Sequence, residues 1–402
     1  MSSVEDTDQA MNGADKALLR YWLEKASQIM VIDPDINPWS FPILEHAKRA
    51  PSLIRTLQSV GAAHQQFFDP SKLARCLEER SCALKLVQKE LTTRQAEDLF
   101  PVFLTVFVLG LSTAWINDPG PEWGYEHLRG ARAIINMILH QEESSPFCEF
   151  MIEAYLYWDM ACAFLVPSHL HEPLNTPEMF AAVSRCAQKY HPIGGYAIEI
   201  FYLLGSLGRY CRMVVDTGIR DLVLEATFEE QLTEWEPNRE NIELGWISDA
   251  FRYHGLINLH AICYRRPDRH READQMGYDA ITDLFNAESH LDSTAQSVMP
   301  EQSTRIYALH VVRTLTQIPS SHPCTNIQAI PLLTAGSELT AEDCVERELV
   351  RQRFQAMYSL NHLRANLASL HLLEDLWALR DAGQTVTWLD LMLSRSWLLM
   401  LG

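Results

Sequence analysis

The sequence predicts an all-α protein, and three features of the chain support this fold class. Apolar residues recur at the three- and four-residue spacing of amphipathic helices over most of the 402 residues. Alternating apolar and polar runs, which are typical of strands, are almost absent. Clusters of Pro, Gly, Asp and Ser interrupt the helical pattern. We therefore expect a single large helical domain of packed antiparallel helix hairpins around a central cavity.

The expected helices lie between turn-forming clusters, of which the clearest are 33–35, 118–121, 192–195 and 320–323. The predicted helices cover residues 14–30, 43–67, 71–91, 97–114, 123–141, 147–165, 176–188, 194–216, 221–232, 241–265, 272–286, 301–317, 338–380 with a break, and 386–399. Residues 15–402 would form the helical domain. Residues 1–14 are rich in Asp and lack apolar spacing, so we expect a flexible segment there.

One stretch, residues 99–116, has almost no strongly polar side chain. A membrane span needs about twenty apolar residues. This stretch is shorter, contains Pro101 and Gly110, and is bracketed by acidic residues. We therefore expect a central helix that is buried on all sides, and no membrane span.

Charge and cysteine content limit the partners and the compartment. Lys and Arg together number 33 and Asp and Glu 52, which gives a net charge of −19. Such a chain repels the phosphate backbone of nucleic acids, so direct nucleic-acid binding is not expected. The nine cysteines are scattered, and the N-terminus is acidic without an apolar run. Both features indicate a reducing compartment, and we expect a cytoplasmic location.

Charged residues within apolar helices are the first candidates for chemistry, because a buried charge is costly unless it is paired or bound to a metal. Tyr155 and Asp159 lie one helical turn apart on an otherwise apolar stripe. Asp159 is therefore either a structural acceptor of hydrogen bonds or a ligand of a metal or substrate.

A second candidate group follows on the helix predicted at 194–216. Arg209, Arg212 and Asp216 are spaced at i, i+3 and i+7. Two guanidinium groups on one face can hold a diphosphate, and a nearby carboxylate can share its magnesium ion. The simpler interpretation is a stripe of ion pairs on an amphipathic helix.

The next long helix is polar on two faces. Arg252 and Tyr253 belong to one face, and His254 and Asn258 to another. This excess of polar residues indicates either a cavity lining or a core histidine whose ring binds a carbonyl group. The pair Arg265–Arg266 at the end of the helix is explained by the helix dipole, which favours cations there.

Short motifs in a fixed order carry a family resemblance. They are Leu18–Trp22, Asp35–Trp39, Ala50–Leu53, Val60–His64, Glu122–Trp123, His127–Ala131, Tyr264–Pro267, Ile330–Gly336 and Leu373–Trp377. Together they resemble the fungal-specific transcription-factor domain, which normally follows a binuclear zinc cluster, over roughly residues 16–385. That cluster needs six closely spaced cysteines, whereas the closest pair here is Cys76 and Cys82. The resemblance implies the helical body of a regulator without its DNA-binding module.

Within this family, the chain resembles the atypical humulene synthases of fungal tropolone–sesquiterpenoid biosynthesis, which share this body and lack the zinc cluster. The resemblance implies a magnesium-dependent sesquiterpene cyclase, a carbon–oxygen lyase of secondary metabolism. Such an enzyme ionises farnesyl diphosphate and closes the cation to a humulene-type hydrocarbon. It needs groups that hold the diphosphate and a dry wall that protects the cation.

The chain has no Asp-Asp-x-x-Asp motif, so we assign the site residues from charge placement. The Mg²⁺ ligands would be Asp159 and Asp216. The isoprenoid diphosphate would be bound by Arg209, Arg212 and Arg252. The catalytic cavity wall would consist of Tyr155, Trp158, Tyr253, His254 and Asn258. Aromatic faces in such a wall stabilise cations.

Two other interpretations stay open. The main alternative is a fungal transcriptional regulator without a zinc cluster, located in the nucleus, that acts through protein or metabolite binding. The other is that a zinc cluster is encoded upstream of Met1. The sequence does not specify the ring geometry of a product or the oligomeric state, and a homodimer is left open.

Overall fold

The computed structural model describes residues 14–93, 99–116, 120, 122–140, 145–187, 189–266 and 300–401. These residues form helices joined by turns, and their only β-type pairing is an isolated bridge between His191 and Gly195. The all-α prediction is confirmed.

The α-helices are α2 (Lys16–Glu24), α3 (Leu44–Ala47), α4 (Pro51–Gln65), α5 (Lys72–Thr93), α6 (Phe100–Leu111), α7 (Thr113–Ile116), α8 (Tyr125–Leu139), α9 (Pro146–Cys162), α10 (Pro177–Cys186), α11 (Ile198–Thr217), α12 (Leu222–Glu234), α13 (Ile242–Asn258), α15 (Pro300–Leu315), α16 (Ala329–Ser337), α17 (Cys344–Asn361), α18 (Arg364–Asp381) and α19 (Trp388–Ser394). Short 3₁₀ helices are η1 (Ala26–Met30), η2 (Pro34–Ile36), η3 (Phe41–Ile43), η5 (Ser168–Leu170) and η7 (Pro323–Gln328). The element η6 (Leu259–Tyr264) is a π-helix that continues α13.

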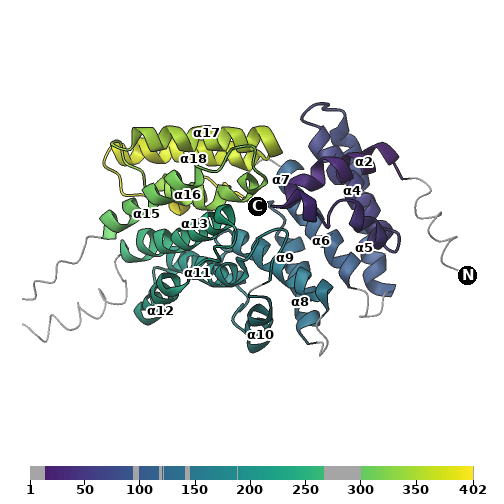
Figure 1. Ribbon diagram of the computed structural model, residues 1–402, viewed down its shortest axis with the longest axis horizontal. Helices are drawn as coiled ribbons and strands as arrows, with labels where there is room; N and C mark the ends of the chain where they lie inside the picture. The colour runs from purple at the N-terminus through teal and green to yellow at the C-terminus, as the bar shows by residue number, and fades with distance from the viewer. Residues whose placement is uncertain are drawn as a thin grey trace, which may run out of the picture.

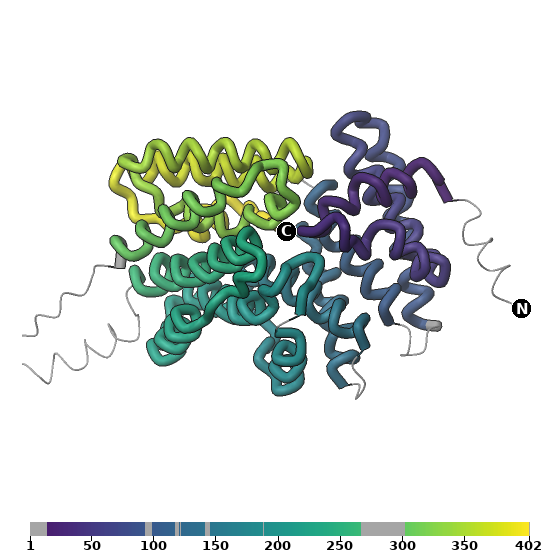
Figure 2. Tube along the Cα trace, viewed as in Figure 1, coloured from purple at the N-terminus to yellow at the C-terminus, as the bar shows by residue number. Residues whose placement is uncertain are grey.

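Helices that lie close together along the chain pack against each other: α4 on α5, α9 on α11, α13 on α15 and α17 on α18. In Figure 1, α2 to α7 lie at one end of the elongated molecule, α15 to α18 lie above α11 to α13 at the other end, and α8 to α10 lie between the two ends. Figure 2 shows the same order along the Cα trace. The two ends meet where the indole N–H of Trp115 donates to the carbonyl of Asn361 at 2.8 Å. One continuous apolar core therefore runs through the described residues.

The helix α6 is apolar on all sides. Every residue from Pro101 to Leu111 is buried, and the helix packs against α4, α8 and α9. The prediction of a central buried helix is confirmed. Within the described ranges, no helix is both long and apolar enough to cross a membrane.

Proline positions explain two differences from the predicted helices. The helix predicted at 43–67 is divided, because Pro51 occupies the first position of α4 and ends the preceding turn. The helix α16 was not predicted. Its Pro331 lies in the first turn, where the missing N–H has no helical partner to lose.

The prediction for 338–380 is wrong at its start, since residues 338–343 form the turn between α16 and α17.

The remaining differences concern helix ends. The helix predicted at 386–399 is limited to α19, and the one predicted at 14–30 ends at Glu24 and continues as η1. The helix predicted at 272–286 lies outside the described residues, as does the N-terminal segment up to residue 13.

A buried carboxyl group lies where α10 packs on α9. Glu153 of α9 is 6% exposed, and the thiol of Cys186 at the end of α10 donates a hydrogen bond to it. Burial raises the pKa of Glu153 to about 8, and the nearby charge of Glu149 adds to this rise. The carboxyl group is therefore protonated in the folded protein at neutral pH.

This raised pKa predicts a loss of stability as the pH rises. The folded chain holds the Glu153 proton up to about pH 8, whereas an exposed glutamate releases it near its ordinary pKa of 4.5. Between these values the unfolded chain binds fewer protons, so the free energy of unfolding falls as the pH rises. Glu153→Gln removes this dependence. We expect the variant to exceed the wild type by at least about 1 kcal/mol at pH 8 and to match it at pH 4 in urea unfolding.

The control is Glu126→Gln on α8, whose side chain is 80% exposed, and it should follow the wild type at both pH values. Parallel pH profiles for wild type and Glu153→Gln would contradict the assignment.

Candidate functional site

Three of the predicted site residues form one buried polar group between α9 and α11. The hydroxyl of Tyr155 donates to Asp159 Oδ1 at 2.7 Å, and Arg209 Nη2 donates to the same oxygen at 2.5 Å. Asp159 is 1% exposed. Burial alone would lower the pKa of Arg209, but the charge and hydrogen bond of Asp159 raise it above its usual value. The guanidinium group is therefore a permanent cation that neutralises the buried carboxylate.

A glycine allows the two helices to approach at this ion pair. A Cβ atom on Gly205 of α11 would lie 3.1 Å from Asp159 Oδ2 and 3.5 Å from Arg209 Nη1. The carbonyl of Gly205 also accepts a hydrogen bond from Arg209 Nη1 at 2.9 Å. Close packing of α9 on α11 thus holds both charged groups in place.

Arg212 and Asp216 form a separate pair farther along α11. Arg212 Nε donates to Asp216 Oδ1 at 2.8 Å, and Arg212 Nη1 donates to the carbonyls of Phe164 and Leu165. The second carboxylate oxygen of Asp216 accepts from the backbone N–H of Ser168 at 2.9 Å. This pair fastens the segment after α9 to α11.

Arg252 and Tyr253 lie where α13 meets α15. Arg252 Nε donates to Asp249 at 2.8 Å, and its guanidinium group lies 4.5 Å from the centre of the Tyr253 ring. The Tyr253 ring also packs against Tyr307 and His310 of α15.

His254 and Asn258 belong to a different network inside the core. His254 Nδ1 and Thr334 Oγ1 share a hydrogen bond of 2.8 Å, and the Trp388 indole N–H donates to Asn258 Oδ1 at 2.9 Å. Burial lowers the pKa of His254 to about 3, so its ring is neutral. Trp158 lies elsewhere, on α9, with its ring edge-to-face against Phe107 of α6.

The structure thus brings Tyr155, Asp159 and Arg209 together and distributes the other predicted residues among four further places. The two predicted magnesium ligands, Asp159 and Asp216, bind different arginines. Among the described residues, no group of three or more His, Cys, Asp or Glu side chains could hold a metal ion. Magnesium binding remains a prediction.

The buried group borders a narrow cleft of about 30 Å³, lined by residues that include Tyr125, Arg129, Arg132, His171, Tyr155, Asp159 and Arg209. A cavity needs about 10–15 Å³ to hold one water molecule, and typical ligand pockets measure about 300–1,000 Å³. This cleft therefore has room for one or two water-sized groups.

A larger cleft of about 420 Å³ opens between η6, α15, α18 and the segment before α19. We call it the arginine cleft, because four of its lining residues are arginines. It is lined by Ala261, Arg265, Arg266, Gln302, Arg305, Glu338, Thr340, Arg380, Gln384, Thr385, Val386, Thr387 and Asp390. Its volume is that of a small-metabolite pocket.

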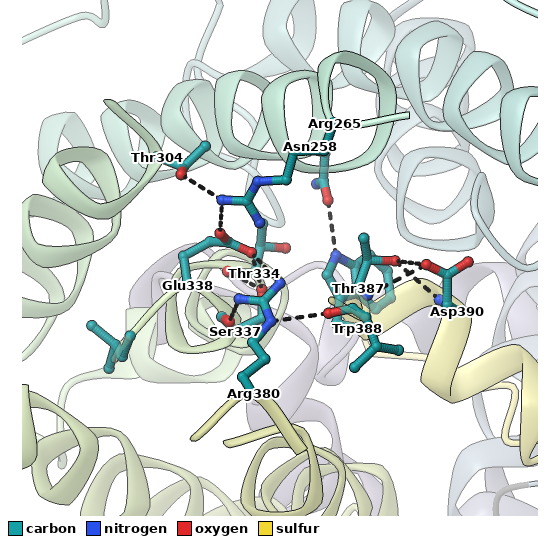
Figure 3. A network of polar contacts seen from close by, with 12 residues as sticks. Asn258, Arg265, Thr304, Thr334, Ser337, Glu338, Arg380, Thr387, Trp388 and Asp390 are labelled. Atoms are coloured by element: carbon teal, nitrogen blue, oxygen red, sulfur yellow. Dashed lines mark hydrogen bonds and ion pairs between the residues drawn. The ribbon is translucent and has the colours of Figure 1, made fainter. Parts of the chain in front are cut away.

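A buried carboxylate organises this cleft. Glu338 follows α16, and its side chain is 2% exposed. Arg265 Nη2 donates to Oε2 at 2.7 Å, and Arg380 Nη2 donates to Oε1 at 3.0 Å, so the two arginines flank it (Figure 3). Burial would raise the pKa of Glu338, but the charges of Arg380 and Arg265 lower it below its usual value. Glu338 is therefore ionised and fixes both guanidinium groups.

The other arginines of the cleft are held at its rim. Arg266 donates to Oδ1 of Asp390. The second oxygen of Asp390 closes a capping box with Thr387 at the start of α19 (Figure 3). Arg305 binds Asp343 and Glu342. Arg265 Nε is buried and has no hydrogen-bond partner within the described part of the chain.

The sequence did not predict this site. The pair Arg265–Arg266 was explained by the helix dipole alone, and Glu338, Arg380 and Asp390 were not singled out. The signal available was the arginine pair within the motif Tyr264–Pro267. Its partners could not be identified, since Glu338 lies 73 residues from Arg265 and Asp390 lies 124 residues from Arg266.

Comparison with known proteins agrees with the resemblance carried by the short motifs. The model of the fungal specific transcription factor domain matches residues 17–402. No curated protein and no solved structure matches the chain. This match covers nearly the whole chain, including the helices that build the buried Asp159 group and the arginine cleft. The chain therefore belongs to the family of the fungal specific transcription factor domain.

Proposed function

We propose that this chain is the regulatory domain of a fungal transcriptional regulator, and that a small anionic metabolite controls it by binding in the arginine cleft. The observation that carries the proposal is the cleft itself. It offers about 420 Å³ and four arginines against two carboxylates in its lining, in a chain whose net charge is −19. Asp343 and Glu342 beside the cleft also bind Arg305, but within the lining itself the guanidinium groups outnumber the carboxylates, which favours an anionic ligand over a cationic one.

The chemistry of the lining favours carboxylate or phosphate groups. Guanidinium groups bind both of these in a bidentate manner, and partial burial strengthens such bonds. Arg265 and Arg266 are only 25% and 22% exposed in their side chains. The neighbouring Thr385 adds a hydroxyl group, and Val386 adds an apolar wall.

Binding in this cleft would be transmitted because its walls come from separate elements. Arg265 and Arg266 directly follow η6, Arg305 lies on α15, Arg380 on α18, and Asp390 on α19. An anion held by arginines from several helices would fix the position of these helices relative to one another. Regulators use such a difference in contacts to shift between two states.

The acidic character of the chain also fits regulation through proteins. With a net charge of −19, this body would not itself hold DNA phosphates, so we propose that it passes its signal to other proteins or domains.

A sesquiterpene cyclase is the second candidate function. The observation that favours it is the group of Tyr155, Asp159 and Arg209 beside Arg129 and Arg132 in the narrow cleft. Three guanidinium groups and an aromatic ring are suitable for a diphosphate and a developing cation. However, a C15 chain would need far more room than about 30 Å³.

The effector site is tested by isothermal titration of the full chain with citrate, inorganic phosphate and pyrophosphate. We expect at least one of these anions to bind with a 1:1 stoichiometry. Arg266→Gln should weaken that binding about tenfold, because it removes one charged donor from the cleft. The matched control is Arg395→Gln, whose arginine forms a surface pair with Asp375 outside the cleft, and it should bind as the wild type does. Equal binding by both variants would contradict the proposed site.

The regulatory function is tested in fungal cells with the chain fused to a heterologous DNA-binding module upstream of a reporter gene. The fusion should change reporter output relative to the module alone. Arg266→Gln should alter this output at least threefold, because it removes control by the metabolite, and Arg395→Gln should not. A fusion that leaves the reporter unchanged would remove the support for a regulator.

The cyclase candidate is tested by incubating the purified chain with farnesyl diphosphate, with and without Mg²⁺, and analysing volatile products by gas chromatography and mass spectrometry. A magnesium-dependent C15 hydrocarbon that is lost in Arg209→Gln would establish this activity. Because the narrow cleft is too small for a C15 chain, we expect no such hydrocarbon. Circular dichroism should show the same helical content in the wild type and in Arg209→Gln, so that a loss of product is not caused by unfolding.

A further inference from the structure

An exposed stripe of leucines runs along α5. Leu77, Leu84 and Leu91 are 48%, 40% and 52% exposed, although leucine side chains are usually buried. The opposite side of α5 packs on α4 and α6, and α5 lies at the outer end of the molecule in Figure 1. The stripe therefore faces away from the core of its own chain.

The spacing of these leucines is that of a coiled-coil seam. They recur every seven residues. Three positions before each leucine lies another exposed residue, namely Ala74, Ser81 and Gln88. Leucine at the d position with small or uncharged residues at a allows a second helix to pack closely along α5. In a surface helix that needs no partner, these positions would carry charged side chains.

The charges beside the stripe indicate what the partner is. Glu78 and Lys85 occupy the same flank one heptad apart, and both are exposed. In two antiparallel helices related by a two-fold axis, the same flanks face each other. Glu78 of one copy then lies opposite Lys85 of the other, and the pair recurs across the axis. Among the described residues of its own chain, Glu78 forms one ion pair, with Arg75 at 3.3 Å, and such a surface pair contributes little energy.

The other flank excludes a parallel arrangement. In parallel pairing, the flank of Glu78 and Lys85 would face the opposite flank of the partner helix. That flank contains Arg80, which donates to the carbonyl of Leu109 and to Ser112, and Val87, which is buried. Neither side chain is available to pair with Glu78 or Lys85.

We propose that α5 is the centre of a two-fold symmetric homodimer interface, in which it packs antiparallel against α5 of a second copy of this chain. The leucine stripe supplies the apolar contact, and two Glu78–Lys85 pairs fix the direction and register. This inference goes beyond the proposed function and does not depend on it, because the arginine cleft lies at the other end of the chain. One pair of helices buries less than a standard interface, so the dimer forms reversibly with concentration.

The proposal is tested by sedimentation velocity of the full chain between about 1 and 100 µM. The wild type should shift from the mass of one chain to that of two over this range. Leu84→Glu should stay monomeric, because it buries a charge at the centre of the stripe. Glu78→Lys should weaken association about tenfold, since each of two attractive pairs becomes repulsive. Glu78→Lys combined with Lys85→Glu should restore the wild-type dissociation constant.

The matched control is Leu222→Glu on α12, where the leucine is 47% exposed but belongs to no heptad stripe, and it should associate as the wild type does. A wild type that remains monomeric at 100 µM would overturn the proposal. So would failure of the charge exchange to restore association while circular dichroism confirms folded protein. Equal loss in Leu222→Glu would also overturn it, by showing that association is not specific to α5.

Discussion

The carboxylate of Glu338 is the constraint on which the C-terminal half of the molecule depends. Its side chain is 2% exposed, and it lies between Arg265 at the end of η6 and Arg380 of α18. Arg380 also donates to the carbonyls of Ser337 and Val386. A buried carboxylate without a partner is strongly destabilising, so the three groups can only remain buried together. This requirement fixes where α16, α18 and the segment before α19 lie, and it leaves the arginine cleft between them.

The same physical rule operates at Asp159 and Arg209, but with a different result. Here the pair is enclosed by close packing of α9 on α11 around Gly205, so that only about 30 Å³ remains beside it. At Glu338 the flanking arginines come from helices far apart in the chain, and space is left between them. One buried charge therefore locks a helix pair, while the other supports an open site.

The sequence predicted the first of these sites better than the second, for a physical reason. The periodicity of α9 and α11 shows which of their residues share a face, so Tyr155, Asp159 and Arg209 could be chosen from spacing alone. Spacing does not show which helices meet, and so it could not pair Arg265 with Glu338. It also missed α16, because Pro331 suggests a helix break unless its position in the first turn is known. Sequence pattern gave the fold class and the central helix α6, whereas long-range pairing required the structure.

The burial of the two carboxylates in the arginine cleft determines how a ligand could act there. An anion entering the cleft as proposed would compete with Glu338 and with Asp390 for the guanidinium groups. Asp390 is the weaker competitor, because its side chain is 35% exposed, while that of Glu338 is 2% exposed and held by two arginines. A ligand would therefore take Arg266 from Asp390 and leave the Glu338 bridge in place. Asp390 also caps α19 with Thr387. A bound anion would therefore first change the position of the start of α19.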